Sequence, residues 1–193
     1  MSAGRRTATL LLLGVFASVP LTAQWGPARF SGISAGATRS EVSGGFTPGT
    51  RGGGTAGLFY GATMSRNAVL QFEGNWIQKG GGDHRVSYLE LPVLLGLASS
   101  ITGGVFIKAY TGLALAFKLS CNGPDTTANT CDSVKGKEWS WPIGLELGRQ
   151  LEDRTFVAVD LRYSRGLSDV VPTTASRHRT WQLRLILGTP IGQ

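Results

Sequence analysis

Two histidines are the residues of this chain best suited to proton transfer, because an imidazole titrates near neutral pH. Asp83 directly precedes His84, and Asp169 lies in the same polar stretch as His178. A nearby serine would complete a nucleophile, a base and an orienting carboxylate, as in many hydrolases. Both histidines are expected in loops rich in Gly, Ser and Thr, which are poor scaffolds for a preorganised site. We therefore expect no enzymatic activity and no catalytic residue, with a Ser/His/Asp-type hydrolase at the external rim as the alternative.

Cys121 and Cys131 are the only cysteines, and they bracket a polar, turn-rich segment. In an exported protein an isolated pair of this kind is expected to form a disulfide. A metal or redox centre would need further ligands or a C-x-x-C spacing, which the pair lacks. The sequence therefore predicts one stapled loop, and we expect neither a metal nor a cofactor.

The N-terminal segment indicates export. Arg5 and Arg6 precede an apolar run over residues 8–19, and small residues around Ala23 follow. This is the pattern of a secretory signal peptide, and the apolar run is too short to cross a bilayer as a helix. We expect a cleaved signal peptide over residues 1–24 and one mature domain over residues 25–193.

The charge and composition favour an exported all-β domain. The formal net charge of +7 includes Arg5 and Arg6, so the mature domain would carry +5. This excess is too diffuse to indicate nucleic-acid binding. The 28 glycines, together with alternating apolar and polar residues, are typical of a chain made of strands and turns.

Alternation is clearest in a hairpin at the centre of the sequence. Leu70, Phe72 and Trp76 alternate with Gln71 and Glu73, so each group shares one face of a strand. The same analysis predicts eight strands, over residues 30–39, 55–64, 69–76, 86–97, 105–119, 139–148, 157–163 and 181–188, and leaves the faces of the second unassigned. Pro92 and Pro142 fall within strands and predict β-bulges there.

The connections and the aromatic residues indicate a membrane barrel. The first, third, fifth and seventh connections are long or glycine-rich and the others are short, as in outer-membrane barrels. We therefore expect an all-β, eight-stranded, antiparallel up-and-down transmembrane β-barrel. On this topology five aromatic side chains lie at one height near the external rim, as an interfacial girdle: Trp76, Phe117, Trp139, Tyr163 and Trp181.

The polar strand face indicates which side points inward. It carries isolated charges among small residues and no large apolar group, which is typical of the packed inside of a narrow barrel. A soluble, periplasmic, lipocalin-like binding barrel is the alternative, but its water-facing surface would be denser in Lys and Glu. We expect Glu73, Glu90 and Glu146 to pair with Lys108, Arg162 and Arg184, within an interior charge network of Glu73, Glu90, Lys108, Glu146, Asp160, Arg162 and Arg184.

Several segments resemble the PorT-like family of small outer-membrane β-barrels, the outer membrane protein beta-barrel domain of exported bacterial proteins. The most specific is Tyr88-Leu89-Glu90-Leu91-Pro92-Val93-Leu94-Leu95, and Glu73 to Gly80 is also similar. Weaker similarities are Tyr110-Thr111-Gly112, Gly144-Leu145-Glu146 and Arg162-Tyr163 with Gly166-Leu167. The resemblance implies a bacterial outer-membrane location and a barrel architecture. It implies no particular activity.

The expected function is that of a non-enzymatic barrel which presents external loops for structural, lipid-headgroup or partner contacts. A pore is less favoured, because eight strands leave an interior filled by side chains. The expected partners are membrane lipids, with lipopolysaccharide among them, and the barrel-assembly machinery. Ten bases and six acids fall in the expected external loops and strand ends, which suits anionic headgroups; the bases are Arg39, Arg51, Lys79, Arg85, Lys118, Lys135, Lys137, Arg165, Arg177 and Arg179.

Overall fold

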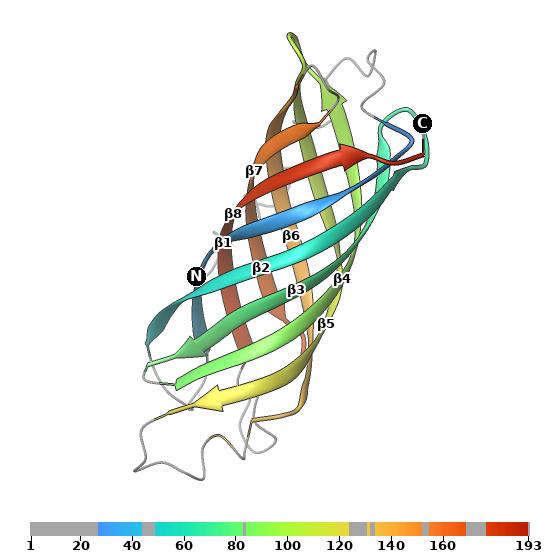
Figure 1. Ribbon diagram of the computed structural model, residues 1–193. Helices are drawn as coiled ribbons and strands as arrows, with labels where there is room; N and C mark the ends of the chain where they lie inside the picture. The colour runs from blue at the N-terminus through green and yellow to red at the C-terminus, as the bar shows by residue number, and fades with distance from the viewer. Residues whose placement is uncertain are drawn as a thin grey trace, which may run out of the picture.

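The computed structural model describes residues 27–43, 49–82, 84–123, 131, 134–151, 155–168 and 177–192. Its strands are β1 (Arg29–Ser43), β2 (Thr50–Thr63), β3 (Ala68–Gly81), β4 (His84–Ser100), β5 (Val105–Asn122), β6 (Lys137–Gln150), β7 (Phe156–Gly166) and β8 (Arg177–Pro190). Each strand pairs antiparallel with its neighbours in sequence, and β8 pairs back onto β1, so the sheet is a closed barrel (Figure 1). The predicted eight-stranded fold is confirmed. The predicted signal peptide lies outside the described residues.

The strands extend further than the sequence predicted, mainly at the rim with the longer connections. β1 ends at Ser43 instead of Arg39, and β3 ends at Gly81 instead of Trp76. The added residues are mostly Gly, Ser, Thr and charged types, so they do not show the apolar alternation that marks a strand in the sequence. Of the helices in the described part of the chain, none is long and apolar enough to cross a membrane.

Large apolar side chains cover the outside of the barrel. On β8, Trp181 and Leu185 are 52% and 69% exposed, whereas Gln182 and Arg184 between them are buried. In β2, whose faces the sequence left open, Leu58 and Tyr60 point outward and Phe59 points inward. An apolar exterior around a charged interior is the inverse of a soluble binding barrel, so the lipocalin-like alternative is wrong.

An apolar cluster fills the inside of the barrel at the end with the short turns. Phe30, Phe59, Phe106 and Phe156 are buried there together, and the rings of Phe30 and Phe156 meet edge to face with centroids 5.8 Å apart. The expectation that no large apolar group lies inside is therefore wrong. Glycines on neighbouring strands make room: a Cβ at Gly188, for example, would lie 2.2 Å from the Phe156 ring.

The two strand prolines do not shift the register. Pro92 pairs opposite Ala114, and Pro142 pairs opposite Ser164, each in step with the residues around it. The register shift between β4 and β5 lies at Ser87 and Tyr88 instead, whose partners are Ser120 and Lys118, so the predicted bulges at the prolines are wrong. A proline removes one ladder donor, but it adds no extra residue and therefore need not displace the pairing.

The short connections join β2 to β3, β4 to β5 and β6 to β7. In the β4–β5 turn, Gly103 and Gly104 have φ angles of 67° and 77°, values that residues other than glycine rarely adopt. The amide of Ile101 donates to the carbonyl of Val105 at 2.7 Å and closes this turn. Both ends of the barrel wall, Arg29 of β1 and Pro190 of β8, lie at this same rim.

Candidate functional site

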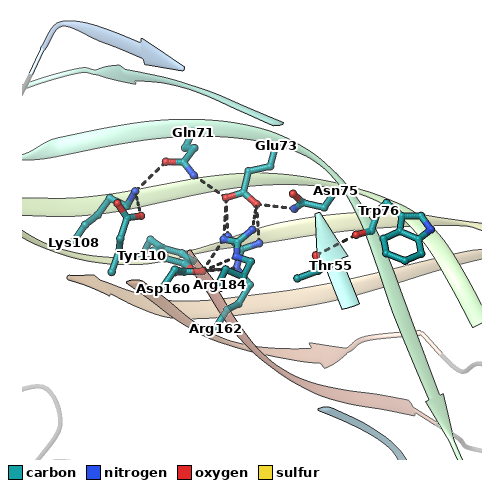
Figure 2. A network of polar contacts seen from close by, with 11 residues as sticks. Thr55, Gln71, Glu73, Asn75, Trp76, Lys108, Tyr110, Asp160, Arg162 and Arg184 are labelled. Carbon is teal, nitrogen blue, oxygen red and sulfur yellow. Dashed lines mark hydrogen bonds and ion pairs between the residues drawn. The ribbon is translucent and has the colours of Figure 1, made fainter. Parts of the chain in front are cut away.

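A network of buried charges spans the middle of the barrel (Figure 2). Glu73 on β3 accepts hydrogen bonds from Arg162 Nη2 at 2.7 Å and from Arg184 Nη1 at 3.0 Å. Arg184 also pairs with Asp160, with Nη2 2.7 Å from Oδ2. All four side chains are buried. One carboxylate of β3 therefore links two arginines that belong to the opposite wall, β7 and β8.

Local pairing positions these groups. Asp160 and Arg184 lie directly opposite each other on β7 and β8, and cross-strand neighbours of opposite charge stabilise a sheet. Tyr110 on β5 donates from its hydroxyl to Asp160 Oδ1 at 2.5 Å. Between them, β6 carries Gly144, where a Cβ would lie 2.3 Å from the Tyr110 hydroxyl oxygen. A glycine is therefore required on β6 for this contact.

A second pair joins the network from the side of β5 and β6. Lys108 and Glu146 are cross-strand neighbours and form an ion pair. Gln71 accepts from Lys108 Nζ at 3.0 Å and donates to Glu73 Oε1 at 2.7 Å. The Gln71 amide therefore connects the Lys108–Glu146 pair to the group around Glu73. Since unpaired charge in a narrow barrel would be destabilising, each ion of this layer has a partner of opposite sign.

A further charged cluster lies closer to the rim with the longer connections, and only Glu90 of this cluster was expected in the interior. Lys79 pairs with Glu90 at 2.6 Å, and Glu138 Oε2 lies 2.8 Å from His178 Nδ1. Lys79 and Glu138 are 4.0 Å apart, so the two pairs form one group. The expected partners of Glu90 were Lys108, Arg162 and Arg184, and this expectation is wrong: its partner is Lys79, which was placed in a loop.

The two histidines do not lie in loops, as the sequence suggested. His84 begins β4 and His178 is the second residue of β8, and both are buried. Asp83 and Asp169, their expected companions, lie outside the described residues. The carboxylate beside His178 is that of Glu138. The Glu138 side chain passes over Gly166 on β7, where a Cβ would lie 3.2 Å from Glu138 Oε1. A side chain at this position would crowd the pair.

The next layer inward consists of small polar side chains. Within the described residues, the hydroxyls of Ser140, Ser164 and Thr180 and the amide of Gln182 have no hydrogen-bond partner. They lie between the Glu138–His178 pair and the central arginines, on β6, β7 and β8. Buried groups of this kind normally bind water when protein partners are absent. Chemically, this layer offers donors and acceptors to water or to a small polar molecule.

Cys121 at the end of β5 forms a disulfide with Cys131, with the Cα atoms 5.7 Å apart. Lys118 holds the same segment to β5, because its Nζ donates to the carbonyls of Cys131 at 3.1 Å and Val134 at 2.8 Å. Among the described residues, no group of three or more His, Cys, Asp and Glu side chains is arranged to hold a metal ion.

The aromatic residues expected at the membrane interface lie toward the ends of their strands at the rim with the longer connections. Trp76, Trp139 and Trp181 are 41%, 49% and 52% exposed, while Phe117 and Tyr163 are half-buried. Tyr163 packs against Trp181 with ring centroids 4.9 Å apart. Trp141 belongs with this group but was not predicted; its indole nitrogen donates to Thr111 Oγ1 at 2.7 Å.

The fold is similar to those of small outer-membrane barrels. The N-terminal β-barrel domain of Pseudomonas aeruginosa OprF has 13% identity and a TM-score of 0.54, covering 85% of this chain and 98% of that one. Neisserial surface protein A has 13% identity and a TM-score of 0.58, with coverage of 84% and 97%. Outer membrane protein OprG from Pseudomonas aeruginosa has 9% identity and a TM-score of 0.56, with coverage of 86% and 97%.

At these identities the likeness concerns the fold alone, and no curated protein matches the sequence. The family is shown by the sequence itself, because residues 8–185 match the model of the outer membrane protein beta-barrel domain. The narrower PorT-like assignment stays a prediction. Taken with the closed eight-stranded barrel and its apolar exterior, this match shows that the chain belongs to the family of outer membrane protein beta-barrel domains.

Proposed function

We propose that the protein is a non-enzymatic, membrane-embedded barrel that presents its external loops and rim for structural, lipid or partner contacts. It would be exported with a cleaved signal peptide and inserted in the outer membrane by the barrel-assembly machinery. The observation that carries this proposal is the contrast between the two faces of β3, where Phe72 and Trp76 point outward while Glu73 is buried among ion-paired arginines.

The same interior argues against a conducting pore. The phenylalanine cluster around Phe30 and Phe156 fills the end with the short turns, and the network around Glu73 fills the middle. A chain of paired charges and packed rings leaves no continuous water path in a narrow barrel. We therefore infer that the barrel acts through its outer surface and external end.

A rim hydrolase is the second candidate, and one observation favours it. Glu138 lies beside His178 as an orienting carboxylate lies beside a catalytic base. Within the described residues, however, Glu138 is the only hydrogen-bond partner of His178. A nucleophile would have to approach from elsewhere, so this arrangement gives weaker support than the membrane-facing surface gives to a structural role.

The test of membrane embedding uses the stability of a closed barrel in detergent. Unheated protein should migrate differently from boiled protein on a denaturing gel, and the protein should fractionate with outer membranes. Identical mobility of the two samples, together with recovery in the soluble periplasmic fraction, would overturn the proposal.

A further inference from the structure

Three arginines face outward beside one another at the external end of β7, β8 and β1. Arg179 on β8 lies opposite Arg165 on β7 and opposite Glu41 on β1. Arg39 on β1 lies opposite Trp181. All three guanidinium side chains are exposed. Arg165 and Arg179 lie two residues along their strands from Tyr163 and Trp181, whose rings pack against each other at a tilt. The barrel thus carries a cationic patch, Arg39, Arg165 and Arg179, at the upper edge of its aromatic belt.

The patch is not neutralised by its neighbours. Glu41 pairs with Arg179 at 3.5 Å, but both side chains are about half exposed, and such pairs are weak. In the described part of the chain, neither Arg39 nor Arg165 has an ion-pair partner. Like charges directly opposite each other on adjacent strands are destabilising, so an anion bound between Arg165 and Arg179 would relieve their repulsion. Arginine also matches the geometry of phosphate oxygens.

The surface around these arginines is hollowed. A hollow of about 660 Å³ is lined by Arg39, Ser40, Glu41, Thr50, Tyr163, Arg179 and Trp181. Two of its walls are guanidinium groups, and the Tyr163–Trp181 pair lies on the membrane side. The hollow is therefore suited to a polar, negatively charged group that sits at the height of the membrane interface.

A second, apolar recess of about 380 Å³ lies lower on the same three strands. Its outward-facing lining residues are Ile33, Ala35, Val157, Leu185 and Leu187. Ala35 is four residues from Arg39 on β1, which corresponds to about 13 Å along a strand. A charged hollow above an apolar recess at this separation fits an amphiphile, whereas a soluble anion would use only the upper hollow.

We propose that the outer face of β7, β8 and β1 binds a phosphorylated membrane lipid of the external leaflet. Arg39, Arg165 and Arg179 contact the phosphate of its headgroup, Tyr163 and Trp181 support the headgroup, and an acyl chain lies in the recess over Ala35. Lipid A, a phosphorylated glycolipid, has this chemistry. The inference rests on the proposed function, because it requires that this face meets the external leaflet.

The experiment measures binding of diphosphoryl lipid A to the folded barrel in detergent micelles by native mass spectrometry. The test variant is Arg39→Gln/Arg165→Gln/Arg179→Gln. The matched control is Arg29→Gln/Arg66→Gln/Arg149→Gln, which removes three arginines that are also exposed but lie at the opposite rim. Heat-modifiable migration of both variants shows that the barrel is intact, so a failure of membrane embedding is distinguished from a failure of this site.

Affinity for diphosphoryl lipid A should fall roughly ten-fold or more in the test variant, because it removes the three guanidinium contacts to the phosphate, and should be unchanged in the control. Glu41→Gln should raise the affinity, and Ala35→Leu, which fills the recess, should lower it. Inorganic phosphate at the same concentration as diphosphoryl lipid A should not displace the lipid. Equal losses in the two triple variants, no loss in the test variant, or full competition by inorganic phosphate would each overturn the proposal.

Discussion

The hydroxyl of Tyr110 reaches Asp160 across Gly144 of β6, a position that has no side chain. Its oxygen lies 2.5 Å from Asp160 Oδ1, and Arg162 Nε donates to the same hydroxyl at 2.9 Å. Asp160 in turn pairs with Arg184. The contact between Tyr110 and Asp160 therefore ties β5 to the charged wall of β7 and β8 without involving β6.

Gly144→Ala should destabilise the barrel by about 1–3 kcal/mol, because the new methyl group would displace the Tyr110 ring from its site. Gly74→Ala is the matched control: it places the same methyl group on a strand, where the nearest atom would be the Leu91 side chain at 3.9 Å. Unfolding by urea in detergent measures both. Equal midpoints for the two variants would show that the Tyr110 contact contributes little.

Glu73→Ala should destabilise by about 3–5 kcal/mol, because it leaves Arg162 and Arg184 buried with one carboxylate between them. Glu41→Ala removes a carboxylate from a half-exposed pair with Arg179, so its effect should be below about 1 kcal/mol. The same urea titration separates them. A mild effect of Glu73→Ala would indicate that water reaches the interior and solvates the arginines.

Lys79 and Glu90 should behave as a coupled pair. Each single replacement, Lys79→Ala or Glu90→Ala, should destabilise by about 3–5 kcal/mol, since the remaining buried charge loses its nearest partner. The double variant should be more stable than the sum of the single effects predicts, because it leaves neither charge behind. Strict additivity in this double-mutant cycle would rule out the coupling.

The disulfide should be dispensable for assembly. Intact mass of the unreduced protein should show no free thiol, and Cys121→Ala/Cys131→Ala should still give a heat-modifiable barrel. The reason is that β5 keeps its pairing with β4 and β6 and Lys118 still holds the segment to the barrel. Loss of the folded form in this variant would mean that the bridge supports the wall itself.

The non-enzymatic assignment predicts no turnover of phospholipid, lipopolysaccharide or peptide substrates by the purified, folded barrel. The assay should include His84→Ala and His178→Ala. Any turnover that either substitution abolishes would favour the rim hydrolase, and His178 beside Glu138 would then be its base.

The barrel itself was predictable from the sequence, because alternation along strands such as β3 and β8 is a local property. The charge pairs near the rim were not, because Lys79 is followed by three glycines and was assigned to a loop. A simple count would have placed it: Lys79 is an even number of residues from Glu73, and His178 is an even number from Arg184, so each shares the inward face.

The same count places Phe106 and Phe156 inside, since they are an even number of residues from Lys108 and Asp160. Their burial was missed because the inward face was expected to carry no large apolar group. A local sequence pattern does not show which buried acid forms an ion pair with which buried base. Glu73 and Arg184 are 111 residues apart, and their contact depends on the closure of the whole sheet.

This separation has a consequence for the order of assembly. Glu73 belongs to the third strand, while its partners Arg162 and Arg184 belong to the last two. A partly built sheet that ends before β7 carries the Glu73 carboxylate with neither arginine, and is disfavoured in an apolar environment. We therefore expect the Glu73 carboxylate to be neutralised only when β7 and β8 join the sheet, which would disfavour incomplete barrels until the final strand is in place.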